Sequence, residues 1–269
     1  MINLFETDIR DDNRKSSKGN QLKWNSLNKW YKADYTGYEG LSEYMVSHLL
    51  KYSDMNSDEY VLYDTEEIMY KNTRYLGCKS NNFLESGSRL ITLERLFNER
   101  YGESLYRSIY AISGIKDRIR FVVEQTERIT GMNDFGKYLC MLLTIDALFL
   151  NEDRHTHNIA VIRDEYGRFH YCPVFDNGAA LLSDIRMDYP LNSDIYELID
   201  SVQSKTVCSD FTEQLEATEE LYGQTVRFSF GHKEIDRLLA AEPYYSDEIK
   251  NRISCVLSEQ RRRLSYLFT

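Results

Sequence analysis

The sequence lacks the features of a secreted protein, of a membrane-spanning protein and of a protein that binds nucleic acid over an extended surface. Its five cysteines are scattered without a Cys-x-x-Cys pair, and the N-terminus has neither a basic segment nor an apolar one. The longest apolar run, residues 139–150, is too short to span a membrane and contains Asp146. The net charge of −10 disfavours extended nucleic-acid binding. We therefore expect a cytoplasmic protein with no membrane span, whose cysteines are reduced core residues.

Proline is equally scarce, and this bears on the number of domains. With only 3 prolines and no low-complexity tract, no linker or repeat divides the 269 residues. A hydrophobic fraction of 42% and an aromatic fraction of 13% argue against disorder. The length therefore suits one large domain or two small lobes.

Hydrophobic periodicity changes along the chain. The first third is predicted to be β-rich with one helix after Gly40, with strands over residues 28–35, 60–70, 74–84 and 88–97. The rest is predicted to be mostly helical, over residues 105–131, 135–150, 194–202 and 246–268, with a hairpin over 158–175 turning at 164–167. Gly131 stands where a helix C-cap could be. We predict an α+β fold with a β-rich N-lobe, residues 1–98, a helical C-lobe, residues 99–269, and a ligand-binding cleft between them.

The segment NEDRHTHN, residues 151–158, places many polar groups directly after an apolar helix. His155 and His157, with His170 at the end of the hairpin, offer one interpretation, a zinc site. Zinc hydrolase sites need three or four ligands, and the remaining histidines, His48 and His232, are far away along the chain. A histidine-based metal site is therefore disfavoured.

Phosphoryl transfer uses other atoms of this segment. Asp153 and Asn158 lie five positions apart, and Asp176 follows an apolar strand in PVFDNG. Phosphoryl transfer needs a carboxylate beside the attacking hydroxyl, and an amide and a second carboxylate that hold Mg²⁺ on the phosphates. We predict Asp153 in the first role, and Asn158 and Asp176 as metal ligands. Since the ordinary pKa of an aspartate is low, Asp153 should position the hydroxyl rather than deprotonate it beforehand.

The N-terminal third supplies the remaining parts of such a site. Lys32, on a predicted strand, would point to the α- and β-phosphates of ATP, and a helix carboxylate would hold it there, Glu43 by preference and Glu39 as the second choice. A glycine turn could close over the phosphates with its backbone amides; it consists of Ser17, Lys18, Gly19, Asn20 and Gln21.

Taken in order, these residues resemble the HipA-like serine/threonine kinases, the toxin kinases of bacterial toxin–antitoxin pairs. The D-x-H-x-x-N catalytic loop and the following aromatic-Asp pair of that family are matched by Asp153, His155, Asn158 and Phe175-Asp176. The Gly-x-Gln-x-Lys core of its glycine loop is matched by Gly19, Gln21 and Lys23, and its Val-Glu-Arg-Phe hinge by Leu93-Glu94-Arg95-Leu96. The resemblance extends from about Ser16 to Asp176, and this chain looks like a compact member of the family.

The resemblance implies a bilobal protein-kinase-like fold, ATP and Mg²⁺ as cofactors, a protein substrate with a serine or threonine hydroxyl, and an antitoxin protein as partner. It also implies that Glu94, Leu96 and Phe175 contact ATP, and that Ser16, or its rival Ser17, is autophosphorylated. Phe97 stands where the family has an acidic residue for the ribose.

Several alternatives stay open. D-R-H-x-x-N is also the catalytic loop of phosphatidylinositol-type lipid kinases, so the acceptor could be a lipid or another small molecule. A pseudokinase that binds nucleotide without turnover would keep the same fold. His155 could stabilise the loop or the γ-phosphate, or be an ordinary loop histidine. Arg154 and His157 are structural or substrate-facing, without preference.

Overall fold

The computed structural model describes residues 1–9 and 21–269, which divide into two compact units. Unit 1 comprises Met1–Asn82, Phe175–Val202 and Phe228–Thr269, and unit 2 comprises Phe83–Val174 and Gln203–Arg227. Each unit takes its residues from separated parts of the chain, whereas the predicted lobes are consecutive. The lobe boundary at residue 98 therefore stays a prediction.

Unit 1 is built on a five-stranded sheet with the strand order β1-β4-β5-β3-β2. β1 pairs with β4 in parallel, and the other neighbours are antiparallel. The buried Trp24 packs edge-on against Tyr70, and Ile68 and Tyr31 complete the centre of this core. The strands are β1 (Ile2–Asn3), β2 (Lys23–Ser26), β3 (Lys29–Ala33), β4 (Tyr63–Tyr70) and β5 (Thr73–Asn81).

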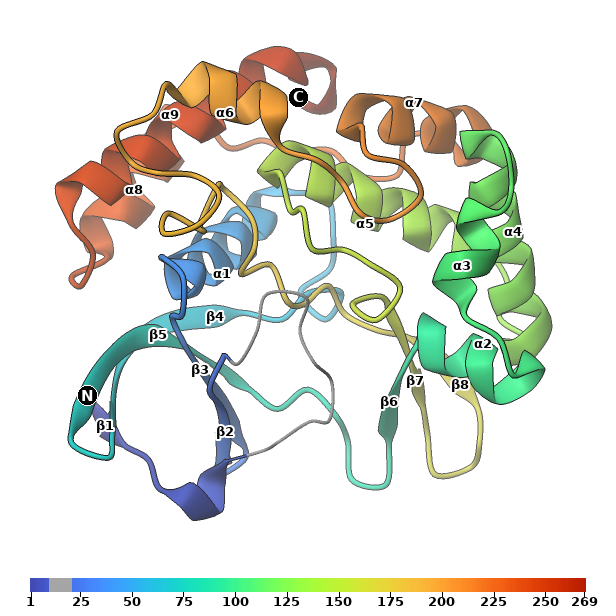
Figure 1. Ribbon diagram of the computed structural model, residues 1–269, viewed down its shortest axis with the longest axis horizontal. Helices are drawn as coiled ribbons and strands as arrows, with labels where there is room; N and C mark the ends of the chain where they lie inside the picture. Colours follow the sequence, from blue (N-terminus) through green and yellow to red (C-terminus); the bar gives the residue numbers. More distant parts are fainter. Residues whose placement is uncertain (10–20) are drawn as a thin grey trace. The chain divides into compact units, whose positions relative to one another are not determined.

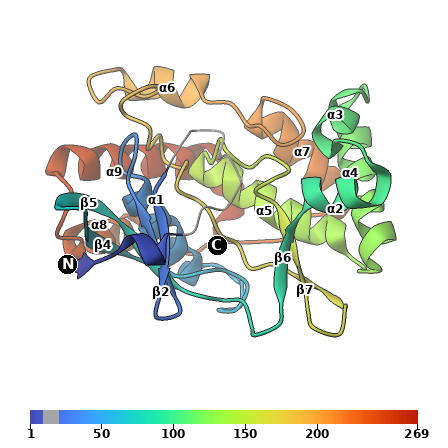
Figure 2. The ribbon, with the colours of Figure 1, turned by 60° about the horizontal axis from the view of Figure 1, so that its bottom comes forward.

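In unit 1, α1 contacts β4, β5 and α8, while α9 packs against α8 and α6 (Figures 1 and 2). Nearly every residue of α1 is buried, because it lies between the sheet and the C-terminal helices. The helical segments are η1 (Glu6–Asp8), α1 (Glu39–Leu49), η2 (Leu50–Tyr52), α6 (Ile195–Ser201), α8 (His232–Ala241), α9 (Asp247–Arg263) and η3 (Ser265–Leu267).

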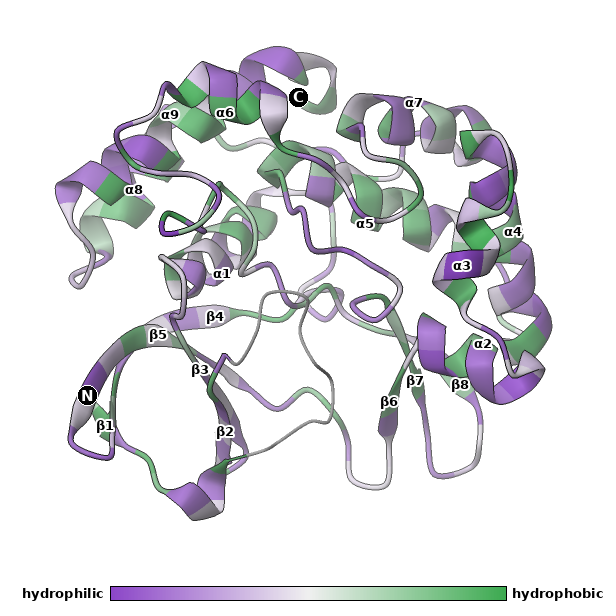
Figure 3. Ribbon diagram, viewed as in Figure 1, coloured by the Kyte–Doolittle hydropathy of each residue, from purple (hydrophilic) through white to green (hydrophobic). Residues whose placement is uncertain are grey.

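Unit 2 is mostly helical, with α5 at its centre between α4 and α7. All residues of α5 except Lys137 are buried, and the helix is coloured as hydrophobic along most of its length in Figure 3. The elements of unit 2 are β6 (Arg89–Thr92), α2 (Leu93–Tyr101), α3 (Leu105–Tyr110), α4 (Ile115–Thr130), α5 (Phe135–Phe149), β7 (Ala160–Arg163), β8 (Phe169–Tyr171) and α7 (Phe211–Tyr222). β6, β7 and β8 form an antiparallel sheet in that order. The predicted α+β fold class is confirmed.

The predicted strand over residues 88–97 is wrong beyond its first half. The strand ends at Thr92, whose side chain accepts a hydrogen bond from the Arg95 amide and so caps a new helix, α2. Leu93, Leu96 and Phe97 are buried at helical spacing, which is why the chain turns helical here.

The predicted helix over residues 105–131 is two helices, α3 and α4. Gly114 separates them with a φ of 92°, a conformation that residues with a Cβ rarely adopt. The C-cap at Gly131 is confirmed, with a φ of 72° and its amide bonded to the Glu127 carbonyl. The single N-terminal helix, the hairpin and the helices over 135–150, 194–202 and 246–268 are also confirmed.

Two predictions about exposure can be checked against the described residues. Four of the five cysteines are buried, but Cys255 lies exposed on α9, so the prediction that all are core residues is wrong for this one. In the described part of the chain, no helix is both long and apolar enough to cross a membrane.

Candidate functional site

A lysine and two carboxylates from separate segments meet in unit 1. The Lys32 Nζ lies 2.6 Å from Glu43 Oε1 and 2.6 Å from Asp176 Oδ1. Asp176 is 144 positions from Lys32 in the sequence, yet both belong to the same compact unit. The structure thus brings together the predicted lysine, its predicted helix carboxylate and the predicted metal-binding aspartate.

The position of Lys32 follows from its strand. Tyr31, Lys32 and Ala33 are all buried at the end of β3, where Lys32 pairs with Cys78 of β5. The Lys32 ammonium also lies 5.1 Å from the centre of the Tyr63 ring. Burial alone would lower the pKa of Lys32, but the carboxylates of Asp176 and Glu43 outweigh it and hold this pKa well above its ordinary value. Lys32 is therefore a fixed positive charge.

Glu43, rather than the second choice Glu39, is the partner of Lys32. Its side chain is buried, and its second oxygen accepts a hydrogen bond from the Asn177 amide at 2.8 Å. The Glu39 carboxylate instead accepts from the amides of Thr36, at 2.7 Å, and Gly37, at 3.2 Å, in the turn before α1. Glu39 therefore stabilises the start of the helix on which Glu43 lies.

In unit 2, Asp153 and Asn158 are held together within one loop. The Asn158 side-chain nitrogen donates to the Asp153 carbonyl at 2.8 Å and to its carboxylate at 3.2 Å. His155 Nε2 lies 3.7 Å from the other Asp153 oxygen, and both side chains are largely buried. The rings of His155 and His157 meet edge to face. The Asn158 side chain therefore holds Asp153, and His155 lies close to it.

Arg154 anchors this loop to α5. Its guanidinium forms hydrogen bonds of 3.0–3.1 Å with the Asp146 carboxylate, and both side chains are 1% exposed. Thr206 Oγ1 donates to the Arg154 carbonyl at 2.6 Å, and the Asn151 side chain also donates to Asp146. Arg154 is thus structural. The role of Asp146 was not predicted from the sequence, although a lone carboxylate in an apolar helix was the available signal.

The predicted ATP contacts, Glu94 and Leu96, lie in α2 of unit 2. The Glu94 amide donates to the Thr156 carbonyl, and its carboxylate accepts from Thr156 Oγ1 at 2.7 Å and from the Tyr106 amide at 3.0 Å. Burial alone would raise the pKa of Glu94, but hydrogen bonds from Ser104, Thr156 and Tyr106 bring it below its ordinary value. Leu96 is only 5% exposed. The structure gives both residues structural roles, and their contact with ATP stays a prediction.

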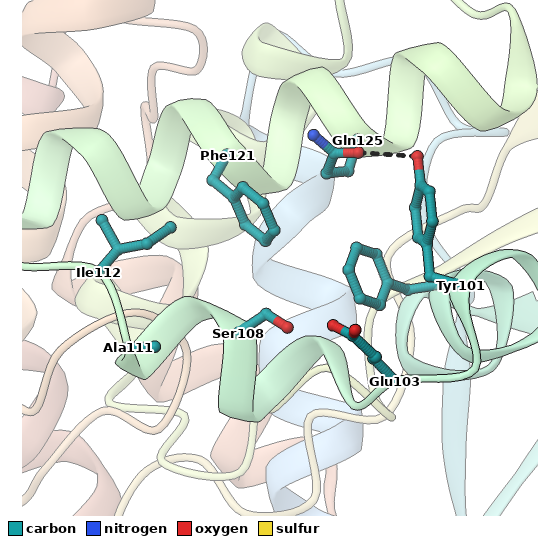
Figure 4. Close-up of a pocket in the computed structure, with 8 residues that line it drawn as sticks. Tyr101, Glu103, Ser108, Ala111, Ile112, Phe121 and Gln125 are labelled. Carbon is teal, nitrogen blue, oxygen red and sulfur yellow. Dashed lines mark hydrogen bonds between the residues drawn. The ribbon is translucent and has the colours of Figure 1, made fainter.

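Phe97, at the position expected to face the ribose, belongs to a groove on α2, α3 and α4. Its ring packs against those of Tyr101 and Phe121. The groove has a volume of about 490 Å³, and Figure 4 shows the Tyr101 hydroxyl meeting the Gln125 side chain in it. Its lining residues are Phe97, Tyr101, Glu103, Ser108, Ala111, Ile112, Phe121 and Gln125, none of them a predicted site residue.

The glycine turn lies mostly outside the described residues. Ser16, Ser17, Lys18, Gly19 and Asn20 are not described, so their predicted roles rest on the sequence alone. Gln21 and Lys23 are half-buried, and Lys23 begins β2, opposite Lys32 in the register. Phe175 is half-buried directly before Asp176.

The three histidines considered as zinc ligands contact other side chains: His155 and His157 contact each other, and His170 contacts Asp164. His170 Nε2 lies 3.0 Å from the Asp164 carboxylate in the hairpin turn. Within residues 1–9 and 21–269, no group of three His, Cys, Asp or Glu side chains is placed to hold a metal ion.

The fold resembles that of protein kinases. It has a strand with a buried lysine (β3), a helix with its carboxylate partner (α1), a polar loop after the buried helix α5, and an aspartate further along the chain. Among solved structures, the chain is similar to the proinflammatory kinase CtkA of Helicobacter pylori, with a TM-score of 0.59 and 15% identity over 99% of this chain and 95% of that one. At this identity the likeness defines the fold and no more. It confirms the predicted protein-kinase-like fold.

Other comparisons are more distant. A HipA toxin of Shewanella oneidensis MR-1, solved with HipB and operator DNA, gives a TM-score of 0.47 and 13% identity over 95% of this chain and 62% of that one. No protein-family model matches the sequence, and no curated protein matches it either.

Proposed function

We propose that this chain is an ATP-dependent kinase that transfers a phosphoryl group to a serine or threonine hydroxyl of a protein. The observation that carries the proposal is the Lys32 ammonium lying 2.6 Å from both the Glu43 and the Asp176 carboxylates. A structural ion pair needs one carboxylate, whereas a buried lysine between two carboxylates suits a site that also receives phosphates and a cation. The kinase-like fold supports the same function.

The residues present fit ATP and Mg²⁺ by their chemistry. Asp176 supplies a carboxylate, and Asn158 supplies an amide oxygen, since its nitrogen is taken up by Asp153. Both are the hard oxygen ligands that Mg²⁺ prefers, and when bound the ion would neutralise charge on the phosphates. Lys32, a fixed cation, would bind phosphate oxygens, and Glu43 would keep it oriented. We propose that the predicted residues of unit 1 and those of unit 2 take part in the same reaction.

Asp153 would act on the acceptor hydroxyl. Its carboxylate is fixed by Asn158 and lies near His155, so it can accept a hydrogen bond from a hydroxyl in a defined direction. The acceptor proton would pass to Asp153 late in the transfer, as the acceptor oxygen bonds to the γ-phosphorus and the bond from that phosphorus to the bridging oxygen breaks, which releases ADP. The buried pair of Arg154 and Asp146 keeps the loop rigid while this happens.

Radiolabelled phosphoryl transfer from Mg²⁺-ATP tests the proposal. We expect Asp153→Ala to lower the rate about 10²- to 10⁴-fold, and Asp176→Ala to do at least the same. Asp58→Ala, which removes an exposed carboxylate of unit 1, is the matched control and should leave the rate unchanged. Equal incorporation in the wild type and in both site variants would remove the assignment.

The acceptor, the turnover of ATP and the autophosphorylation site each require a separate assay. Incorporation into phosphatidylinositol vesicles but not into protein would favour a lipid kinase, and ATP binding without transfer would favour a pseudokinase. Mass spectrometry after incubation with ATP tests autophosphorylation at Ser16 or Ser17. The cytoplasmic location, the toxin activity and the antitoxin partner stay predictions, and co-purification from the native host tests the last.

A further inference from the structure

The segment after Asp176, residues 177–186, runs along the start of α1, and we call it the strap. Both the strap and α1 belong to unit 1. Its first amide, that of Asn177, donates to Glu43 Oε2 at 2.8 Å, while Lys32 occupies Oε1 of the same carboxylate. Glu43 therefore connects the lysine to the backbone directly beside Asp176.

Two further side chains hold the strap, one from α1 and one from Tyr38, the residue directly before α1. Ser42 Oγ donates to the Ala180 carbonyl at 2.7 Å, and Tyr38 Oη donates to the Leu181 carbonyl at 2.6 Å. All four residues are fully buried. Inside a protein such hydrogen bonds are not replaced by water when they are lost, so each fixes one point of the strap.

The strap backbone needs such contacts. Asp176, Leu181 and Leu182 have φ values of 61°, 58° and 59°, which are unfavourable for residues with a Cβ. Residues in this region persist only where the surrounding structure holds them. Free of α1, the strap would relax towards ordinary backbone angles, and Asp176 at its start would move with it.

Backbone contacts fasten the far end of the strap. The Tyr38 amide donates to the Ser183 carbonyl at 3.2 Å, and the Arg186 amide donates to the Thr36 carbonyl at 3.1 Å. A Cβ at Gly37 would lie 1.7 Å from the Ser183 carbonyl oxygen, so only glycine allows this approach. The start of α1 and the turn before it, residues 36–38, thus hold the strap at both of its ends.

We propose that Tyr38 and Ser42 are positioning residues, which keep the Asp176 carboxylate beside Lys32 by fastening the strap to α1. This inference rests on the proposed function of Asp176 as a metal ligand. Loosening the strap should weaken Mg²⁺ binding before it weakens ATP binding, since Asp176, the proposed metal ligand, directly precedes the strap.

The test compares two double variants of the same helix. Tyr38→Phe with Ser42→Ala removes the two strap contacts. Tyr44→Phe with Ser47→Ala is the matched control, because the Tyr44 hydroxyl donates to Leu238 of α8 and the Ser47 hydroxyl accepts from the Tyr63 amide of β4. Each double variant loses one buried phenolic hydroxyl and one buried aliphatic hydroxyl. The two variants differ only in whether the lost hydroxyls contact the strap.

Two measurements are made on each variant. Hydrogen exchange of the amides in residues 177–186 should quicken roughly tenfold or more in the strap variant and not in the control. The Mg²⁺ concentration that half-saturates ATP turnover should rise roughly tenfold, while the KM for ATP at saturating Mg²⁺ changes little. The control should match the wild type in both.

Either of two results overturns the inference: unchanged exchange in the strap, or faster exchange with an unchanged Mg²⁺ requirement. A wild type that turns over no ATP would refute the proposed function instead. In that case exchange and equilibrium Mg²⁺-ATP binding are measured, and equal values in the strap variant and the wild type still overturn the inference.

Discussion

Asp34 follows directly after β3 and holds a carboxyl group at the junction of β3, α1 and the α8–α9 connection. Its Oδ1 accepts from the Gly40 amide at 2.6 Å, and its Oδ2 accepts from the Tyr245 hydroxyl at 2.7 Å. Burial, together with the nearby carboxylates Glu39 and Glu242, raises the pKa of Asp34 to about 7, although the two hydrogen bonds oppose this. The free energy of unfolding of unit 1 should therefore depend on whether the Asp34 carboxyl group is protonated.

The sign and size follow from this pKa. The folded pKa of about 7 lies above the ordinary value of 3.8, so the folded state keeps a proton that the unfolded state loses. The stabilisation is fully present below about pH 4 and is lost as the pH rises towards 7. At ~1.4 kcal/mol per pKa unit, the loss is about 4 kcal/mol. Asp34 keeps some exposure to solvent, so this is an upper limit.

Asp34→Asn isolates the effect, because it keeps an acceptor for Gly40 and cannot ionise. Both tryptophans of the chain, Trp24 and Trp30, lie in unit 1, so tryptophan fluorescence during urea unfolding reports on the unit that contains Asp34. Between pH 4.5 and 7 (about the span set by the two pKa values) the wild type should lose stability relative to the variant.

Asp58→Asn, at an exposed carboxylate of the same unit, controls for the general effect of removing a charge. Its stability should follow the wild type across the same range. Parallel curves for the wild type and Asp34→Asn, with no change in their separation from pH 4.5 to 7, would refute the raised pKa of about 7.

Three further predictions concern local structure. Asp146→Ala should cost about 3–5 kcal/mol, because the buried Arg154 guanidinium loses its carboxylate partner; urea unfolding followed by far-UV circular dichroism measures this, and a loss below about 1 kcal/mol would contradict it. Thr92→Ala should cost about 1 kcal/mol by removing the cap of α2, and Thr92→Ser, which keeps the acceptor, should cost less in the same assay. Gly77→Ala should unfold unit 1, because a Cβ would lie 2.0 Å from the Lys32 carbonyl oxygen; native-like tryptophan fluorescence in this variant would contradict that.

Features that depend on neighbouring residues were predictable from the sequence. The strand that carries Lys32 is rich in aromatic residues, and the loop with Asp153 and Asn158 follows an apolar helix, so both could be placed without a structure. Residues 88–97 misled because their apolar positions suit a strand at the start and a helix afterwards. The cap that decides between the two depends on one side chain, that of Thr92.

Contacts between distant positions could not be predicted in this way. Tyr38 and Leu181 lie 143 positions apart, and Thr156 and Glu94 lie 62 apart, yet each pair shares a buried hydrogen bond. A tyrosine hydroxyl that donates to a carbonyl leaves no periodic pattern, since the acceptor is backbone and any residue could supply it. Glu94 therefore matched a hinge motif in sequence while its side chain serves the loop beside it.

The two clusters of predicted residues share one principle of construction. In unit 1, the buried Glu43 accepts from the Lys32 ammonium and from a backbone amide; in unit 2, the buried Asp146 accepts from the Arg154 guanidinium and from a side-chain amide. Removing either cation would leave a buried carboxylate and destabilise the unit. A loss of activity in a Lys32→Ala variant would therefore mix unfolding with lost chemistry. Asp153→Asn and Asp176→Asn, at more exposed carboxylates that keep their shape, separate the two effects more cleanly.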